Sequence, residues 1–242
     1  MIIAFFAIFI SALLGGLVVV TQCSIKILPR LLTFSGGYLL ANTLLHLMPE
    51  LFSSKVIPVH IGGYIMIGFF FQRFIETFSA GVEHGHAMAS DSGHCCVKHY
   101  KLFSFLTSIA LHALLDGTLL AHGHDHHATN DGLLLGMMLH KFLEAVALMS
   151  VLGGFTLSIK RMSLYLVLFS LASPIGLWLS SYANHYISDY GNIIVLSIVT
   201  GNFLYISSTM LFEANPNHHS NQFTLWISLF GAGLAALVEL VL

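Results

Sequence analysis

Eight apolar stretches follow one another along the chain, and short polar segments separate them. A hydrocarbon core about 30 Å thick requires about 20 apolar residues for each spanning helix. Stretches of that length lie near residues 2–21, 31–52, 59–78, 102–122, 132–152, 162–182, 191–212 and 223–242. The pattern predicts an all-α polytopic membrane protein with about eight transmembrane helices, in which residues 1–242 form a single membrane domain.

The composition agrees with this prediction and leaves little chain for anything else. The 242 residues are 56% hydrophobic and only 8% charged, whereas soluble domains carry about 25% charged residues. The connections have no room for a soluble catalytic or nucleic-acid-binding domain, so we expect a lipid bilayer and no nucleic acid as a partner. The first stretch has no basic segment before it, and we expect a retained helix there, not a cleaved signal peptide.

Basic residues between the stretches predict the orientation. The first, third and fifth connections and their flanks contain most of them: Lys26, Arg30, Arg73, Lys98, Lys101, Lys160 and Arg161. The opposite side has only Lys55. By the positive-inside rule, the odd-numbered connections face the cytoplasm and both termini are extracytoplasmic. The sequence does not distinguish among a plasma, a bacterial inner and an organelle membrane.

Two connections are rich in histidine, which is typical of short metal-binding tracts. The cytoplasmic loop near residues 79–100 contains His84, His86, His94, Cys95, Cys96 and His99. The external loop contains His124, His126 and His127, which we expect to form an access path for metal together with His46 and Glu50. The alternatives are solvated polar linkers for the loops and, for the second span, a helix that ends at Pro49.

Four ionisable residues lie deep in the fourth and fifth spans, where such residues are costly and usually functional. His112 and Asp116 are four residues apart, as are His140 and Glu144, so each pair lies on one helix face. At 1.5 Å per residue, the pairs lie about 9–15 Å and about 12–18 Å below the external surface. Two imidazoles and two carboxylates suit zinc, iron(II) or manganese better than calcium. Hydrogen bonding that only holds the helices together is the alternative.

Other polar residues in the spans lead to separate expectations. Lys141 lies near the midplane and needs a compensating partner, which Glu144 or Asp116 can provide. Gln72 and Glu76 lie near the inner end of the third span, where we expect them at the membrane–water interface. Pro174 frees a backbone carbonyl in the sixth span and permits a kink beside a cavity or a neighbouring helix.

Five motifs, in chain order, resemble the ZIP (Zrt/Irt-like protein) family of metal transporters. They are Ser35-Gly36-Gly37 with His46-Leu47-Met48-Pro49-Glu50, His112-Ala113-Leu114-Leu115-Asp116-Gly117, His140-Lys141-Phe142-Leu143-Glu144, Ser173-Pro174-Ile175-Gly176 and Gly201-Asn202-Phe203-Leu204-Tyr205. The resemblance covers essentially the whole chain. It implies a carrier, not an enzyme, that moves zinc and sometimes iron, manganese or cadmium toward the cytoplasm.

The same resemblance implies a first metal site made by His112, Asp116, His140 and Glu144, on helices that move against a scaffold. The transported ion would be the bound metal, with no separate cofactor, and a homodimer is a candidate assembly. Three positions depart from the family's two-metal pattern, namely Ala113, Lys141 and Ser173. We therefore expect one bound metal, with the ammonium of Lys141 in the place of a second cation.

An intramembrane zinc metalloprotease is the principal alternative, because Leu115-Asp116-Gly117 matches a zinc-ligand element of that class. Such an enzyme needs HExxH, with two histidines one turn apart and a glutamate as general base. Here Lys141 stands at the position of the base and Glu144 at the position of the second histidine. A cation-diffusion exporter would have about six spans and a soluble C-terminal domain, and a haem protein would need paired axial histidines.

Overall fold

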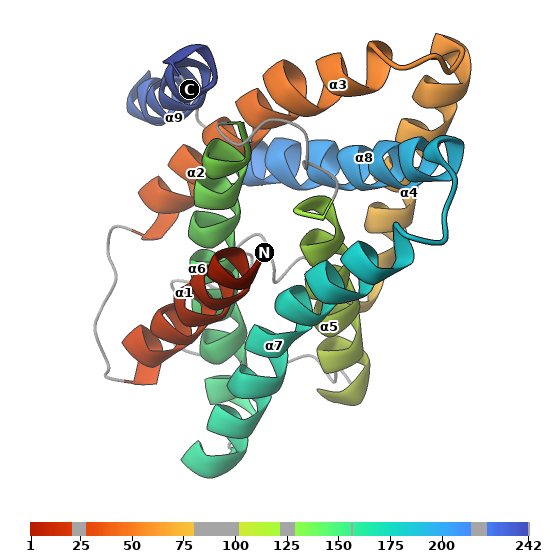
Figure 1. Ribbon diagram of the computed structural model, residues 1–242. Helices are drawn as coiled ribbons and strands as arrows, with labels where there is room; N and C mark the ends of the chain where they lie inside the picture. The colour runs from red at the N-terminus through yellow and green to blue at the C-terminus, as the bar shows by residue number, and fades with distance from the viewer. Residues whose placement is uncertain (21–27, 80–101, 122–128, 156, 214–221, 242) are drawn as a thin grey trace.

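The computed structural model describes residues 1–20, 28–79, 102–121, 129–155, 157–213 and 222–241, and over these residues the chain is helical without strands (Figure 1). The elements are α1 (Ile2–Val20), α2 (Leu28–Asn42), the π-helical turn η1 (Thr43–Leu47), α3 (Met48–Phe52), α4 (Pro58–Ser79), α5 (Leu102–Leu119), α6 (Thr129–Gly154), α7 (Ile159–Ala183), α8 (Asp189–Glu213) and α9 (Gln222–Val241). The predicted all-α class is confirmed.

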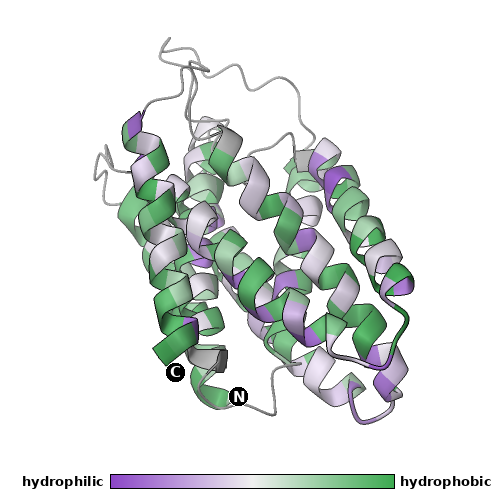
Figure 2. Cartoon of the chain, turned by 90° about the horizontal axis from the view of Figure 1, so that it is seen from above, coloured by the Kyte–Doolittle hydropathy of each residue, from purple (hydrophilic) through white to green (hydrophobic). Residues whose placement is uncertain are grey.

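Seven of the described helical segments are long and apolar enough to cross a membrane, and the continuous segment α2–η1–α3 counts as one of them. The remaining long helix, α4, has 22 residues and is not among these seven; its second half contains Gln72, Arg73 and Glu76. Large apolar side chains such as Phe70, Trp226 and Leu240 are exposed, and hydrophobic residues (green) recur along the helices in Figure 2. A water-facing surface rarely exposes so many large apolar groups, and the chain is a multi-pass membrane protein.

The helices pack into two bundles. One bundle comprises α1, α5, α6 and α7, and the other comprises α2, α4, α8 and α9. The bundles meet mainly where α2 packs on α6 and where α4 packs on α5. The two helices that carry the deep ionisable residues therefore belong to one bundle, and each faces a helix of the other.

The second span does not end at Pro49, as one interpretation of the sequence had it. Helix α2 continues through the π-helical turn η1 into α3, which reaches Phe52. Proline has no N–H to donate to the preceding turn, and the wider turn before it accommodates this loss, since the N–H of Met48 donates to the carbonyl of Thr43. His46 lies inside this turn. The chain ends lie at the same end of the molecule (Figure 2).

Glycines allow α5 and α7 to approach closely enough to fix the position of α5. A Cβ added to Gly117 would lie 1.9 Å from the carbonyl oxygen of Ser173, and one added to Gly176 would lie 2.0 Å from that of Leu114. Small residues at helix crossings are the usual means of close packing in membranes. Because Gly117 follows Asp116 directly, this crossing also fixes where the Asp116 carboxylate lies.

Gly117→Ala is expected to destabilise the protein by about 1–3 kcal/mol or more, because the added methyl group meets backbone that cannot rotate away. Thermal unfolding in detergent micelles measures the effect. Gly62→Ala is the matched control, since a Cβ at Gly62 meets nothing within 4 Å and alanine favours a helix by about 0.8–1 kcal/mol. Equal stability of the two variants would contradict the close crossing.

Candidate metal centre

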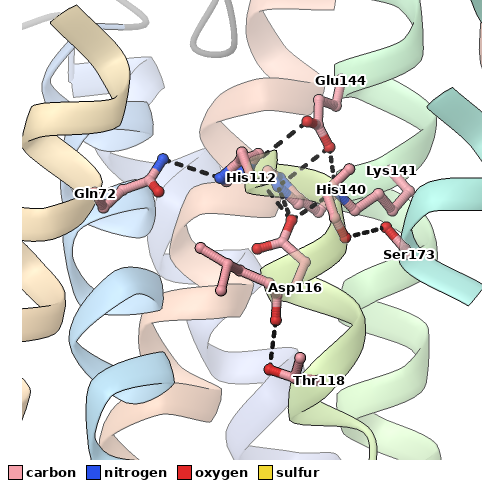
Figure 3. Close-up of polar contacts among 10 residues, drawn as sticks. Gln72, His112, Asp116, Thr118, His140, Lys141, Glu144 and Ser173 are labelled. Atoms are coloured by element: carbon pink, nitrogen blue, oxygen red, sulfur yellow. Dashed lines mark hydrogen bonds and ion pairs between the residues drawn. The ribbon is translucent and has the colours of Figure 1, made fainter. Parts of the chain in front are cut away.

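Four side chains from α5 and α6 meet inside the first bundle. His112 and Asp116 come from one turn of α5, and His140 and Glu144 come from one turn of α6 (Figure 3). Each side chain offers one ligand atom, and these four atoms lie within 4.8 Å of one another. All four residues are at most 1% exposed. The convergence predicted from the two i,i+4 pairs is therefore present in the structure.

The spacing of the ligand atoms fits a single tetrahedral metal ion. The Nε2 atom of His112 lies 3.3 Å from Asp116 Oδ2 and 3.6 Å from Glu144 Oε1. The Nε2 atom of His140 lies 3.5 Å from Asp116 Oδ2 and 3.8 Å from Glu144 Oε2. A tetrahedron with metal–ligand bonds of about 2.0–2.2 Å has edges of about 3.3–3.6 Å. The four spacings of 3.3–3.8 Å lie close to these edges and involve both carboxylate oxygens of Glu144.

Several atoms of the cluster lack hydrogen-bond partners within the described part of the chain. They are His112 Nε2, both ring nitrogens of His140, Asp116 Oδ1 and Glu144 Oε1. Buried polar atoms are nearly always hydrogen-bonded, and each exception needs an explanation. A ligand that accepts lone pairs from nitrogen and oxygen provides one.

Lys141 lies within the same cluster. Its Nζ atom is 2.6 Å from Asp116 Oδ2 and forms an ion pair and hydrogen bond with Glu144 Oε2. The ring of Phe169 lies 5.6 Å from the ammonium on another side, within the range of a cation–π interaction. Lys141 is 1% exposed. Its expected partners are therefore both present, and one internal positive charge lies between the two carboxylates.

Helix α7 packs against α5 next to the cluster. The hydroxyl of Ser173 donates to the backbone carbonyl of Ala113 at 2.7 Å (Figure 3). Pro174 follows inside the helix and is buried, as expected for a membrane-helix proline beside a neighbouring helix. Position 173 thus contacts the backbone of the site helix and adds no carboxylate to the cluster.

Gln72 is a buried partner of the cluster that the sequence interpretation did not predict. It was expected at the membrane–water interface, but it is fully buried and its Nε2 atom lies 2.9 Å from Nδ1 of His112. Glu76, one turn further along α4, is also buried and contacts the hydroxyl of Tyr205 and the guanidinium of Arg73. The signal was present, since an amide and a carboxylate four residues apart line one face of an apolar helix.

The remaining predicted residues lie away from this cluster or outside the described residues. His46 pairs with Glu239 of α9 through Nδ1, 3.1 Å from Oε1, and Glu50 is exposed. Their role in an access path stays a prediction. The loop residues fall outside the described ranges: His84, His86, His94, Cys95, Cys96, His99, His124, His126 and His127.

No protein-family model and no curated protein sequence matches the chain. Fold and site together define a multi-pass membrane protein with a buried His/Asp/Glu cluster that fits a metal ion. The resemblance to ZIP transporters rests on the five motifs.

Proposed function

We propose that this protein is a ZIP-like carrier that moves a divalent transition metal, most favourably zinc, across the membrane toward the cytoplasm. The observation that carries the proposal is the four-ligand cluster of His112, Asp116, His140 and Glu144, fully buried within membrane-length helices. Ionisable groups at such positions usually mark the route of an ion or proton. The two-bundle arrangement supports it further, because the whole ligand set belongs to one bundle and can move with it.

The ligand chemistry favours zinc, iron(II), manganese and cadmium over calcium and magnesium. Calcium prefers six to eight oxygen ligands, and magnesium prefers six in octahedral geometry. Two imidazole nitrogens and two carboxylate oxygens are a borderline set that suits first-row transition metals and tetrahedral zinc. Affinity within this group follows ligand type and geometry, so the ions should compete with one another for the same site.

Lys141 favours transport over a structural role for the metal. A structural zinc site is closed and binds its metal as part of folding. In this cluster an ammonium contacts Asp116 and Glu144, two of the four ligands, so an arriving metal must compete with it for these carboxylate oxygens. An internal competitor weakens binding, and a carrier requires binding weak enough for release. The same ammonium argues against proteolysis, because it occupies the position from which a general base would act.

Reconstitution into liposomes tests the proposal directly. Liposomes that contain the protein are expected to accumulate zinc saturably, whereas calcium and magnesium should not accumulate above protein-free liposomes. Iron(II), manganese and cadmium should compete with zinc, since they would share one site. Accumulation of none of these ions above the protein-free control would contradict transport. Cleavage of a membrane peptide in the same liposomes would instead favour the protease.

A further inference from the structure

The hydrogen bond between Gln72 and His112 joins the two bundles at the metal cluster. Gln72 comes from α4, whereas all four ligands come from α5 and α6 of the other bundle. Both side chains are fully buried, and Gln72 Nε2 lies 2.9 Å from His112 Nδ1 (Figure 3). One residue of the second bundle therefore contacts a ligand directly, on the ring nitrogen opposite the one that faces the cluster.

The chemistry of an imidazole ligand gives this contact a role. When Nε2 binds a metal, its lone pair is used and the ring proton lies on Nδ1, where it needs an acceptor. A glutamine side chain offers both a donor, Nε2, and an acceptor, Oε1. In the structure Nε2 faces the ring, and Oε1 has no hydrogen-bond partner among the described residues. A half turn of the amide exchanges the two atoms and converts the donor into an acceptor.

We propose that Gln72 is a positioning residue that adapts to the tautomer of His112 and thereby sets the metal affinity of the site. This inference rests on the proposed function. Without metal, the amide donates to Nδ1, and the proton on Nε2 faces Asp116 Oδ2 at 3.3 Å. The neutral tautomer of His112 that can bind metal through Nε2 carries its single proton on Nδ1, and the amide turns to accept from Nδ1–H. A side chain that can only donate would oppose metal binding.

The origin of Gln72 in the other bundle makes the affinity depend on how the bundles are placed. Helix α4 is held to α8 by close glycine crossings, since a Cβ at Gly68 would lie 1.9 Å from the carbonyl oxygen of Ile198. Gln72 lies one turn after Gly68 and therefore stays with the second bundle. Any displacement of α5 along α4 breaks the hydrogen bond between Gln72 and His112. The Nδ1–H group of His112 would then have lost its acceptor, and the site would bind metal more weakly.

A simpler role, in which Gln72 only holds α4 against α5, has a matched control in the same interface. The hydroxyl of Ser108 donates to the carbonyl of Ile75 at 2.8 Å, one turn from His112 on α5 and one turn from Gln72 on α4. This bond also joins the two bundles, but Ser108 contacts no ligand atom of the cluster. Ser108→Ala therefore removes an interface bond and leaves the tautomer of His112 untouched.

Zinc affinity of the full-length protein in detergent tests the proposal. Equilibrium dialysis against zinc gives the Kd of the membrane site, which is defined as the binding that His140→Ala loses. Gln72→Leu is expected to raise this Kd about 10–100-fold, the usual effect of removing an outer partner of a ligand. Gln72→Glu keeps an acceptor and should restore a Kd near the wild-type value, and Ser108→Ala should also stay near it. The visible spectrum of bound cobalt(II), which reports ligand geometry, should change only in Gln72→Leu.

The outcomes separate this inference from the proposed function. A Kd in Gln72→Leu equal to that of the wild type, or an equal rise in Ser108→Ala, would overturn the positioning role while leaving the metal site in place. Absence of any zinc binding that depends on His140 would overturn the proposed function itself. If Gln72→Leu does not fold, Gln72→Asn serves instead, because its amide is one methylene too short to reach His112. Retention of wild-type affinity by Gln72→Asn would also overturn the proposal.

Discussion

Replacing His140 or Glu144 with alanine is expected to abolish saturable metal uptake while the protein still inserts into the membrane. Each substitution removes one of four ligand atoms from a cluster in which the described residues supply no substitute. Loss of an outer partner alone costs about 10–100-fold in affinity, so loss of a ligand should reduce uptake by more than about 100-fold. Zinc uptake into proteoliposomes with matched protein content measures the effect. His112→Ala and Asp116→Ala should behave in the same way.

His185→Ala provides the control, because His185 is exposed beyond the end of α7 and lies outside the cluster. It should transport zinc at the wild-type rate. Insertion of every variant is checked by its elution as a monodisperse species in detergent. Wild-type uptake by a properly inserted His140→Ala or Glu144→Ala variant would exclude the cluster as the transport site.

The second large effect concerns Lys141, which we expect to limit the membrane site to one metal. Its ammonium contacts Asp116 and Glu144 and occupies the space near the carboxylates where a second cation would lie. In a background that lacks the histidines of the two loops, the wild-type protein should bind one zinc ion. Lys141→Glu removes the ammonium, adds a carboxylate and should bind two. Equilibrium dialysis followed by elemental analysis gives both stoichiometries. Two tightly bound ions with Lys141 intact would rule out the hypothesis that its ammonium takes the place of a second cation.

The stability of Lys141→Met provides an independent measurement of the same contact. Removing one partner of a buried ion pair costs about 3–5 kcal/mol, because the other charge is left without compensation. Here two carboxylates would be left together, so the metal-free variant should unfold at a clearly lower temperature than the wild type. Added zinc should restore more stability to this variant than to the wild type, since the ion supplies the missing charge and no longer competes with an ammonium. An equal effect of zinc on both proteins would show that the ammonium and the metal do not compete.

Much of this protein could be predicted from its sequence because the membrane restricts the choice of structure. A bilayer leaves backbone groups no water to bond with, so apolar stretches of about 20 residues must become helices. The helical repeat then places His112 beside Asp116 and His140 beside Glu144. Lys141 follows His140 directly, and its ammonium requires a carboxylate within reach of the side chain. These local relations follow from residue spacing, and they were sufficient to identify all four candidate ligands.

Only the tertiary structure decided which helices lie against one another. The division into two bundles depends on where small residues permit close crossings, such as Gly117 with Gly176, and a sequence pattern does not pair distant glycines. The burial of Gln72 against His112 and the pairing of His46 with Glu239 follow from that packing. The ligand set could be predicted from the sequence because the two members of each pair are one helical turn apart. The partners that orient it come from helices 40 residues away or more, and packing alone brings them together.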